Sequence, residues 1–360
     1  MKPFKPPQNI IVRGVDTIGT FVLATPFYKE LRRNFPSAKI TLCVKPLVQD
    51  IARGCPYADE IIIYDKKKYG GEIGFIRELK KRNFDTAFIL SGSFHSALTM
   101  YLAGIKQRVG YTHDHRGWLL THKVKEEIRE RKHCVEYLLD ILLSVGCKAE
   151  FPSTPPGLWF DDTVKIRGRE ILSSEKGIDP GGVIIGAGFG VAGEKAREWP
   201  LENWSRLIEL LVSDGKCTVV LFGTSRDKED GDKIKSMISG RYQSFVFNLC
   251  GKTTLEEFAG CLKNISIYLS VDTGGLHIAA ALGLPVVGLY VPGQDERWSP
   301  RSSRDQSRVK VISKKEAVDC APCSQSKMKY CHDNRCIRAI TVGEVFDAVR
   351  VLKDKLSSSS

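Results

Sequence analysis

The sequence predicts an α/β protein with two doubly wound domains, each built around a parallel sheet. The chain has 360 residues, which is long for one hydrophobic core and typical of two domains. Short β-branched segments alternate with longer helical patterns, and this alternation indicates βαβ units. Pro152, Pro155 and Pro156 interrupt it before it starts again. We therefore expect one domain over residues 1–160, a second over 161–345, and a closing helix end with a disordered tail over 346–360.

The first half opens with Asn9–Arg13, whose sequence NIIVR is typical of a buried strand. A turn that contains glycine follows it. The apolar spacing of Phe21–Asn34 then predicts a helix that ends before Pro36. Further strands are expected at 39–44, 60–64 and 86–90, and further helices at 73–82 and 94–103.

The second half repeats this alternation. Strands are expected at 183–186, 217–222, 245–249, 265–271 and 286–290, and helices at 202–213, 228–238, 255–262, 276–282 and 342–355. In doubly wound sheets, ligands bind outside the carboxyl ends of the strands, where loops lead into helix N-termini. We therefore expect the chemistry in a cleft between the two domains, on these loops.

Composition favours a globular protein: 42% of the residues are hydrophobic and 27% are charged, so wholesale disorder is excluded. The sequence has no run of 18 apolar residues, and its first eight residues lack the apolar stretch of a secretory signal. We therefore expect a cytoplasmic protein.

The formal net charge of +12 is unevenly distributed. Residues 1–160 carry 25 Lys and Arg against 16 Asp and Glu, whereas residues 161–360 carry 29 against 26. The first half is therefore the one expected to meet an anionic partner, such as a membrane surface or a phosphorylated substrate. A basic surface that only contacts solvent explains the charge equally well. Nucleic acid is not an expected partner, since the sequence has no recognised motif for it.

Four of the eleven cysteines are clustered as Cys320-x2-Cys323-x7-Cys331-x4-Cys336, with His332 inside the cluster. Four thiolates within 17 residues can form a tetrahedral Zn²⁺ site. The x7 gap is shorter than in zinc ribbons, so reduced thiols or air-formed disulfides are the alternative. A catalytic metal is not expected here, because four cysteine ligands leave no open position.

Three loops carry the candidate chemistry. The first, Val271–His277 (VDTGGLH), follows a strand and opens a helix. Its adjacent glycines allow close approach to the backbone, and a helix start favours an anion. Asp272 could accept hydrogen bonds from sugar hydroxyls. Alternatively, Asp272 or Thr273 only caps the helix.

The second loop, residues 186–200, is glycine-rich and contains Lys195 and Arg197. It is not a P-loop, but a basic loop at a strand's carboxyl end suits a phosphate clamp, unless it is only a solvated loop. The third is the turn between Arg13 and Thr20. Asp16 is the one carboxylate in that turn, and so the local candidate for a general base.

Seven blocks stand in order along the chain: IIVRGVDTIGTFVLATPFYKELRRNFPSAKI, SGSFHSALTMYLAGIKQRVGY, RGWLLTHKV, REWPLENWSRLIELL, VVLFGTSRD, LCGKTTLEE and VDTGGLHIAAALGLPVVGLYVP. In this order they resemble the blocks of glycosyltransferase family 9, which contains the heptosyltransferases that build the lipopolysaccharide inner core. The resemblance runs from about residue 9 to residue 350 and is nearest to the heptosyltransferase II branch.

The resemblance implies a GT-B fold. It also implies inverting transfer of heptose from ADP-L-glycero-D-manno-heptose (ADP-heptose) to a lipid A–core acceptor, without a required metal or cofactor. The N-terminal domain would hold the acceptor and the C-terminal domain the donor. The place of action would be the cytoplasmic face of the inner membrane, with peripheral contact to its anionic surface.

The resemblance also assigns roles by position. On the donor side, Asp272 would contact the heptose, and the rest of the set would bind the diphosphate end or the adenine: Lys195, Arg197, Thr253, Thr273, Gly274, Gly275 and His277. Arg197 stands where the family places a diphosphate-binding lysine, and Thr253 would lie beside the adenine. On the acceptor side, four residues would face the inner-core sugar and its phosphates: Ser93, His95, Arg108 and Arg116.

The catalytic base departs from the family pattern. The family's first turn reads Ser-Ser-x-Gly-Asp, and its Asp is the expected base. Here the turn reads Asp16-Thr17-Ile18-Gly19-Thr20, so that Thr20 occupies the base position. Either Asp16 has taken the role, or the chain binds a nucleotide sugar without transferring it. A family 9 transferase with another sugar donor is the remaining alternative.

Overall fold

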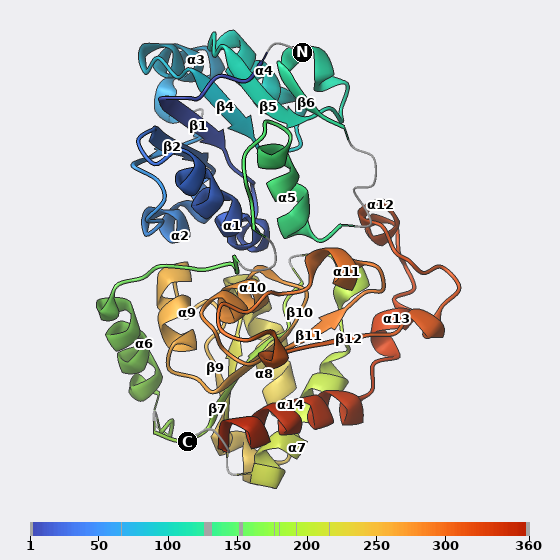
Figure 1. Ribbon diagram of the computed structural model, residues 1–360. Helices are drawn as coiled ribbons and strands as arrows, with labels where there is room; N and C mark the ends of the chain where they lie inside the picture. Colours follow the sequence, from blue (N-terminus) through green and yellow to red (C-terminus); the bar gives the residue numbers. More distant parts are fainter. Residues whose placement is uncertain are drawn as a thin grey trace. The chain divides into compact units, whose positions relative to one another are not determined.

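The computed structural model describes residues 3–65, 67–125, 132–150, 154–175, 177–179, 181–191, 193–215 and 217–357. The chain divides into two compact units, Met1–Trp159 and Phe160–Ser360 (Figure 1). Residues 358–360 of the expected disordered tail lie outside the described residues, and so does Pro152 of the expected linker.

The N-terminal unit is a six-stranded parallel sheet in the order β3-β2-β1-β4-β5-β6. Its strands are β1 (Asn9–Arg13), β2 (Lys39–Val44), β3 (Glu60–Ile63), β4 (Thr86–Ile89), β5 (Gln107–Tyr111) and β6 (His122–Val124). Its helices are α1 (Ile18–Asn34), α2 (Gln49–Arg53), α3 (Glu72–Lys81), α4 (Phe94–Leu102) and α5 (Cys134–Leu143). The strand order is that of a Rossmann sheet: strands are added on one side up to β3, and the next strand, β4, is added on the other side of β1.

The C-terminal unit repeats this topology, with the order β12-β11-β10-β7-β8-β9 and all pairs parallel. Its strands are β7 (Ile184–Gly188), β8 (Thr218–Phe222), β9 (Val246–Asn248), β10 (Ile267–Val271), β11 (Val286–Tyr290) and β12 (Val309–Ser313). Its helices are α6 (Asp162–Ser174), α7 (Leu201–Gly215), α8 (Lys228–Ser236), α9 (Leu255–Leu262), α10 (Gly274–Ala281), α11 (Gln294–Trp298), α12 (Gln325–Lys329), α13 (Arg335–Arg338) and α14 (Val342–Ser357). The reversal falls between β7 and β10. The predicted doubly wound α/β architecture is thus confirmed twice.

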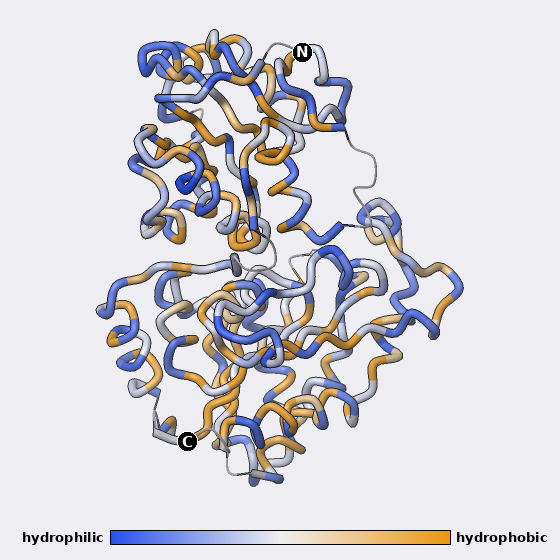
Figure 2. The backbone as a smooth tube through the Cα atoms, in the orientation of Figure 1, coloured by the Kyte–Doolittle hydropathy of each residue, from blue (hydrophilic) through white to orange (hydrophobic). Residues whose placement is uncertain are grey.

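The central strands are buried on both faces, as parallel strands covered by helices must be. Every residue of β7, β10 and β11 is buried, and Figure 2 shows the apolar residues concentrated along the strands of each unit. The closing helix α14 buries Val345, Val349 and Leu352, at helical spacing, in the core of the C-terminal unit. Trp199 Nε1 donates to the Ile340 carbonyl at 2.9 Å and fixes the chain just before this helix.

Helix α1 begins at Ile18, three residues before its predicted start, and it contains Pro26. A proline inside a helix leaves the carbonyl four residues earlier without its usual donor. Here that carbonyl belongs to Val22, and the buried Thr25 hydroxyl donates to it at 2.7 Å. Thr25 therefore replaces the missing bond, and the helix continues through the proline.

The sequence analysis did not predict β5, β6, β12, the longer helices α5 and α6, or the short helices α2, α11, α12 and α13. The two strands β5 and β6 are short and carry Gln107, Arg108, His122 and Lys123, so they lack a hydrophobic pattern. Strand β12 is an edge strand in which none of the residues is buried. Among the described residues, none of the helices is both long and apolar enough to cross a bilayer.

Candidate functional site

The carboxyl ends of β7 and β10 lie side by side in the C-terminal sheet, because these strands pair directly. Their loops bring Arg197 and Asp272 together: Arg197 Nη1 donates to the Asp272 carbonyl at 3.0 Å and lies 3.5 Å from Asp272 Oδ2. Arg197 belongs to a single 3₁₀ turn, Lys195–Arg197, that precedes α7. The two loops that the sequence marked as donor-binding therefore form one cluster.

The Asp272 carboxylate is almost fully buried between two basic side chains. It is 5% exposed, and His277 Nε2 lies 3.7 Å from its Oδ1. On the outer side, Arg197 Nε lies 3.0 Å from Glu194 Oε2. Burial, reinforced by the Asp272 charge, raises the pKa of the neighbouring Tyr290 well above its ordinary value. Tyr290 is therefore neutral. The Arg197 guanidinium lies at the edge of the cluster, between the Asp272 and Glu194 carboxylates.

The start of α10 lacks a side-chain cap. Thr273 is the N-cap residue in extended conformation, but its side chain makes no capping hydrogen bond. Its hydroxyl instead pairs with Ser270 Oγ at 3.0 Å, and Ser270 Oγ donates to the Gly188 carbonyl at 2.6 Å. The interpretation that Thr273 only caps this helix is therefore wrong. In the part of the chain that the structure describes, the first amide groups of the helix have no side-chain acceptor, which suits an anion site.

The glycines of the cluster have a packing role as well. A Cβ on Gly275 would lie 2.9 Å from the Tyr268 hydroxyl oxygen and 3.2 Å from Phe258 Cζ. On Gly188 it would lie 2.1 Å from the same hydroxyl. Both loops thus close over the buried ring of Tyr268, which only glycine permits. Gly274 begins α10 beside them.

Two other predicted donor residues lie outside this cluster of contacts. The Lys195 side chain is exposed, and its carbonyl accepts a hydrogen bond from Asn334 Nδ2 at 3.0 Å. Thr253 is half-buried in the loop before α9, where the adjacent Thr254 forms a capping box with Glu257. A cavity of about 290 Å³ opens beside that capping box.

In the N-terminal unit, both carboxylate oxygens of Asp16 are held by cations. Arg13 Nη2 donates to Oδ1 at 2.7 Å, and Lys45 Nζ lies 3.0 Å from Oδ2. Arg13 is 1% exposed, and its guanidinium stacks 4.6 Å from the centre of the Tyr64 ring. The Thr20 hydroxyl lies 2.7 Å from that of Thr17, one turn away in the chain.

The sequence analysis missed the Lys45 partner, although a signal was present. Asp16 follows β1 and Lys45 follows β2, and these strands pair in parallel register. The carboxyl ends of adjacent parallel strands meet at one edge of a sheet. The pairing of these two residues could therefore have been predicted once the strand order was known.

Ser93 and His95 lie at the start of α4. Ser93 is exposed and caps this helix, accepting a hydrogen bond from the Ser96 N–H at 3.2 Å. His95 Nε2 lies 2.9 Å from Glu72 Oε1, a carboxylate that also accepts from Thr99. Both residues reach the surface near the carboxyl end of β4.

The two arginines predicted for the acceptor both donate to backbone carbonyls. Arg108 Nε donates to the Leu119 carbonyl at 2.6 Å, and burial lowers the pKa of its guanidinium. Arg116 is fully buried, donating to Tyr111 O at 2.8 Å and to Ser91 O at 2.5 Å. These side chains hold the loops in place, and neither presents a guanidinium that is fully exposed for a phosphate.

The clustered cysteines lie around α12 and α13. Cys336 is buried, Cys323 and Cys331 pack against the same small apolar core, and Cys320 is exposed. All are free thiols, and among the described residues no group of three or more His, Cys, Asp or Glu is arranged to hold a metal. The side chains as they stand do not fit the predicted zinc site, and no catalytic step is derived through a metal.

Two Rossmann sheets with candidate ligand loops at their carboxyl ends are the architecture of the GT-B class of two-domain proteins. Residues 73–330 match the profile of glycosyltransferase family 9 (heptosyltransferase). The chain belongs to this family and is a glycosyltransferase, as the seven blocks predicted.

Relatives and solved structures agree with that assignment. The chain is 27% identical over 302 residues to lipopolysaccharide heptosyltransferase 2 of Salmonella typhimurium, covering 82% of this chain and 86% of the relative. The E. coli ADP-heptose lipopolysaccharide heptosyltransferase II structure has a TM-score of 0.78 at 23% identity and covers 98% of this chain and 100% of its own. A family 9 glycosyltransferase of Veillonella parvula has a TM-score of 0.83 at 20% identity, with coverage of 96% and 97%. The GT-B fold and the similarity to the heptosyltransferase II branch are thereby confirmed.

Proposed function

We propose that the chain transfers heptose from ADP-heptose to the lipopolysaccharide inner core by direct displacement with inversion. The observation that carries this is the cluster of Arg197, Asp272 and the uncapped start of α10. It offers a guanidinium and free helix amides to a diphosphate, and a carboxylate to a sugar. The names of the relatives, lipopolysaccharide heptosyltransferases, support this donor and acceptor.

The cluster would act on the leaving group. As the glycosidic bond breaks, negative charge develops on the departing diphosphate, and Arg197 with the α10 amides would stabilise it. Arg197 is already oriented by Asp272, so little reorganisation is needed at the moment of reaction. No metal is needed for this step, because the guanidinium supplies the positive charge.

Asp16 is the proposed general base, and its two cations have different roles. Arg13 is buried and fixes one oxygen, so the carboxylate is oriented before the acceptor arrives. The pair with Lys45 is exposed on both sides, at 43% and 31%, and such pairs contribute only about 0–1 kcal/mol. An acceptor hydroxyl can therefore displace Lys45 from Oδ2 and give its proton to that oxygen. Thr20, whose hydroxyl pairs with Thr17, would contact the acceptor without taking a proton.

The acceptor's lipid end has a matching surface on the N-terminal unit. Phe94, Tyr101 and Trp118 are 36%, 44% and 63% exposed. The centre of the Trp118 ring lies 6.2 Å from that of Phe94 and 5.9 Å from that of Tyr101. Exposed aromatic rings of this kind favour the interface of a bilayer. Phe94 and Tyr101 belong to α4, which contains His95 and is capped by Ser93, and Trp118 belongs to the 3₁₀ turn Arg116–Leu119. We propose that this aromatic surface contacts the membrane and that the protein acts at its cytoplasmic face.

The test is ADP release from ADP-heptose with a truncated lipid A–core acceptor, comparing wild type, Asp16→Asn and Thr20→Asp. If Asp16 is the base, Asp16→Asn lowers kcat by about 10²–10⁴, while the affinity for ADP-heptose changes little. Thr20→Ala is the matched control and loses far less.

Thr20 at the base position favours a second candidate, a protein that binds nucleotide sugar without transferring it. In that case wild type binds ADP-heptose without turnover, and Thr20→Asp gains activity. A wild type that neither binds nor turns over ADP-heptose would point to another sugar donor, and other nucleotide sugars would then be compared by the same ADP-release assay.

A further inference from the structure

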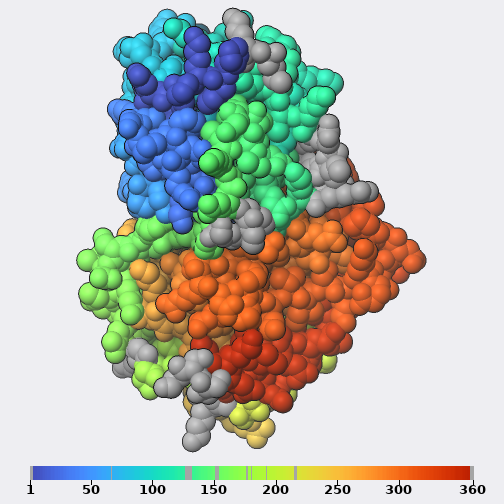
Figure 3. Space-filling model, in the orientation of Figure 1, coloured from blue at the N-terminus to red at the C-terminus, as the bar shows by residue number. Residues whose placement is uncertain are grey.

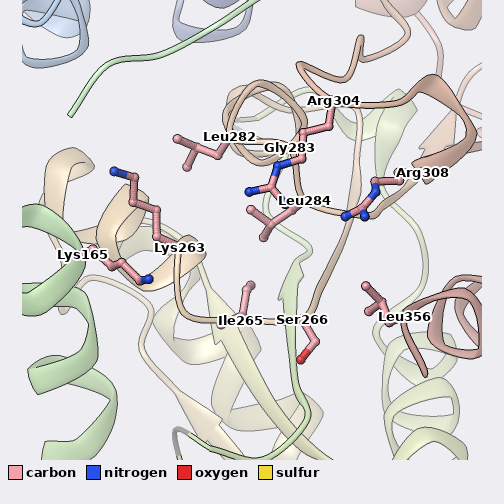
Figure 4. Close-up of a pocket in the computed structure, with 10 residues that line it drawn as sticks. All are labelled: Lys165, Lys263, Ile265, Ser266, Leu282, Gly283, Leu284, Arg304, Arg308 and Leu356. Carbon is pink, nitrogen blue, oxygen red and sulfur yellow. The ribbon is translucent and has the colours of Figure 1, made fainter. Parts of the chain in front are cut away.

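A basic pocket lies in the C-terminal unit at the amino ends of β10 and β11, the sheet edge opposite to Asp272 and Arg197. Its volume is about 500 Å³. Figure 4 shows Lys165 entering from one side and Arg304 and Arg308 from the other, with Leu284 between them. Figure 3 shows that the last part of the chain, in orange and red, covers much of one face of this unit.

The pocket has an unbalanced positive charge. Lys165 comes from α6, Lys263 follows α9, and Arg304 and Arg308 lie in the loop before β12. No carboxylate lines the pocket, and within the described ranges none of the four cations forms an ion pair. The nearby Asp305 accepts both the N–H and the hydroxyl of Ser307, and these bonds, together with the charges of Lys355 and Arg308, lower the pKa of its carboxyl.

The negative ends of the helix dipoles at the pocket neutralise only part of this charge. Helices α9 and α10 both end at the pocket, next to Lys263 and Gly283. Each helix C-terminus is equivalent to about half a negative charge, so together they offset about one of the four cations. Asp305 and Asp161 lie near enough for Arg308 and Lys263 to contribute to the lowered pKa of their carboxyls, but neither lines the pocket, so a positive excess is left there for a ligand.

The arginine side of the pocket is held in place before any ligand binds. A Cβ on Gly283, whose φ is +82°, would lie 2.7 Å from Arg304 Cγ, so the arginine stem rests directly on the glycine backbone. The buried Ser302 hydroxyl accepts the Arg304 N–H at 3.2 Å. The Ser303 N–H donates to the Ala280 carbonyl at 3.1 Å and ties the loop to α10. Such preorganisation lowers the entropy cost of binding.

We propose that this pocket binds a ligand that carries phosphate groups. A guanidinium group can donate two parallel hydrogen bonds to two oxygens of one phosphate. Lys165 and Lys263 supply further positive charge from the other side. The apolar surface of Ile265 and Leu284 contacts the neutral body of the ligand. The ligand is either a free phosphorylated small molecule or the headgroup of an anionic lipid. The proposal does not depend on the transferase reaction.

The experiment is calorimetric titration with inorganic pyrophosphate, comparing wild type with Arg304→Glu/Arg308→Glu. The double variant is expected to bind about tenfold more weakly or worse, since attraction becomes repulsion. Arg206→Glu changes the same charge on the exposed face of α7 and is expected to bind as wild type does. Arg197→Ala separates this binding from the donor loops: the pocket's share of pyrophosphate binding persists in it. Thermal unfolding shows that each variant is folded.

Flotation with phosphatidylglycerol vesicles, with phosphatidylcholine vesicles as the neutral control, distinguishes the two sources. Flotation that needs Arg304 and Arg308 and is competed by pyrophosphate identifies a lipid headgroup. Pyrophosphate binding that needs them, without flotation, identifies a free ligand. If a folded Arg304→Glu/Arg308→Glu variant binds pyrophosphate and vesicles as wild type does, the proposal is wrong.

Discussion

Replacement of Arg197 by alanine tests the donor cluster most directly. The change removes the guanidinium that donates to the Asp272 carbonyl and lies 3.5 Å from its carboxylate. Two effects follow, one on the reaction and one on the fold. On the reaction, loss of one preorganised donor to a developing anion typically costs about 3–4 kcal/mol, or a factor of 10²–10³ in rate.

The effect on stability is smaller but measurable. Removing one partner of a fully buried pair costs about 3–5 kcal/mol. The Asp272 side chain is 6% exposed but that of Arg197 is 19% exposed, so we expect about 2 kcal/mol after allowing for solvent screening. Asp272→Asn removes the stranded charge, so the double variant Arg197→Ala/Asp272→Asn should recover much of this loss. It should not recover the rate.

The two readouts are kcat/KM for ADP release and urea unfolding followed by fluorescence. Lys195→Ala is the matched control, because Lys195 is a cation of the same loop and its side chain is exposed. It should change stability by less than about 0.5 kcal/mol. If folded Arg197→Ala keeps kcat/KM and ADP affinity within about threefold of wild type, the guanidinium serves only to neutralise Asp272, and the donor site lies elsewhere.

Three further changes test the fold and the metal independence. The Thr254 N–H donates to Glu257 and lowers the pKa of its carboxyl, so Glu257→Gln should cost about 1 kcal/mol above the unfolded pKa of about 4.5; that difference should vanish as the pH falls through the lower folded pKa in urea titrations. Thr25→Val should destabilise by about 1–3 kcal/mol in the same assay, because it strands the carbonyl of Val22 and the N–H of Gly157. EDTA should leave the rate of ADP release unchanged. If the clustered cysteines hold zinc, metal analysis of the purified protein should find about one equivalent, and chelation should lower the melting temperature instead of the rate.

The cluster of Arg197 and Asp272 could be predicted as a candidate site from the sequence because its signals are local. The loops around Arg197 and Asp272 each follow an apolar strand and precede a helix, and they carry glycines with few alternatives. Their meeting then follows from strand order alone, since β7 and β10 are neighbours. What could not be predicted is that Gly188 and Gly275 are glycines partly because Tyr268 lies beneath them.

The predicted acceptor arginines show which features of a site the sequence leaves open. In a sequence, an arginine in a turn looks the same whether it meets a phosphate or a carbonyl. Arg116 is fully buried against Ser91 and Tyr111, and burial depends on strands β5 and β6, which the pattern did not reveal. The clustered cysteines illustrate the same limit. Their spacing shows which thiols are close along the chain, but it does not determine the geometry of their side chains.

In each unit a partly exposed charge follows a strand at the point where the strand order reverses, and the two charges have opposite sign: Asp16 after β1 and Arg197 after β7. In each sheet the candidate residues lie at the point where strand order reverses, after β1 in one and after β7 and β10 in the other. In the C-terminal unit the carboxylate of Asp272 is buried and its cation, Arg197, is the more exposed partner. In the N-terminal unit the cation Arg13 is buried and the carboxylate of Asp16 is the more exposed partner. A displacement reaction needs a positive group for the leaving diphosphate and a negative group for the attacking hydroxyl. The buried partner in each pair fixes the orientation of the exposed one, so this inversion of the two pairs supports Asp16, and not Thr20, as the base.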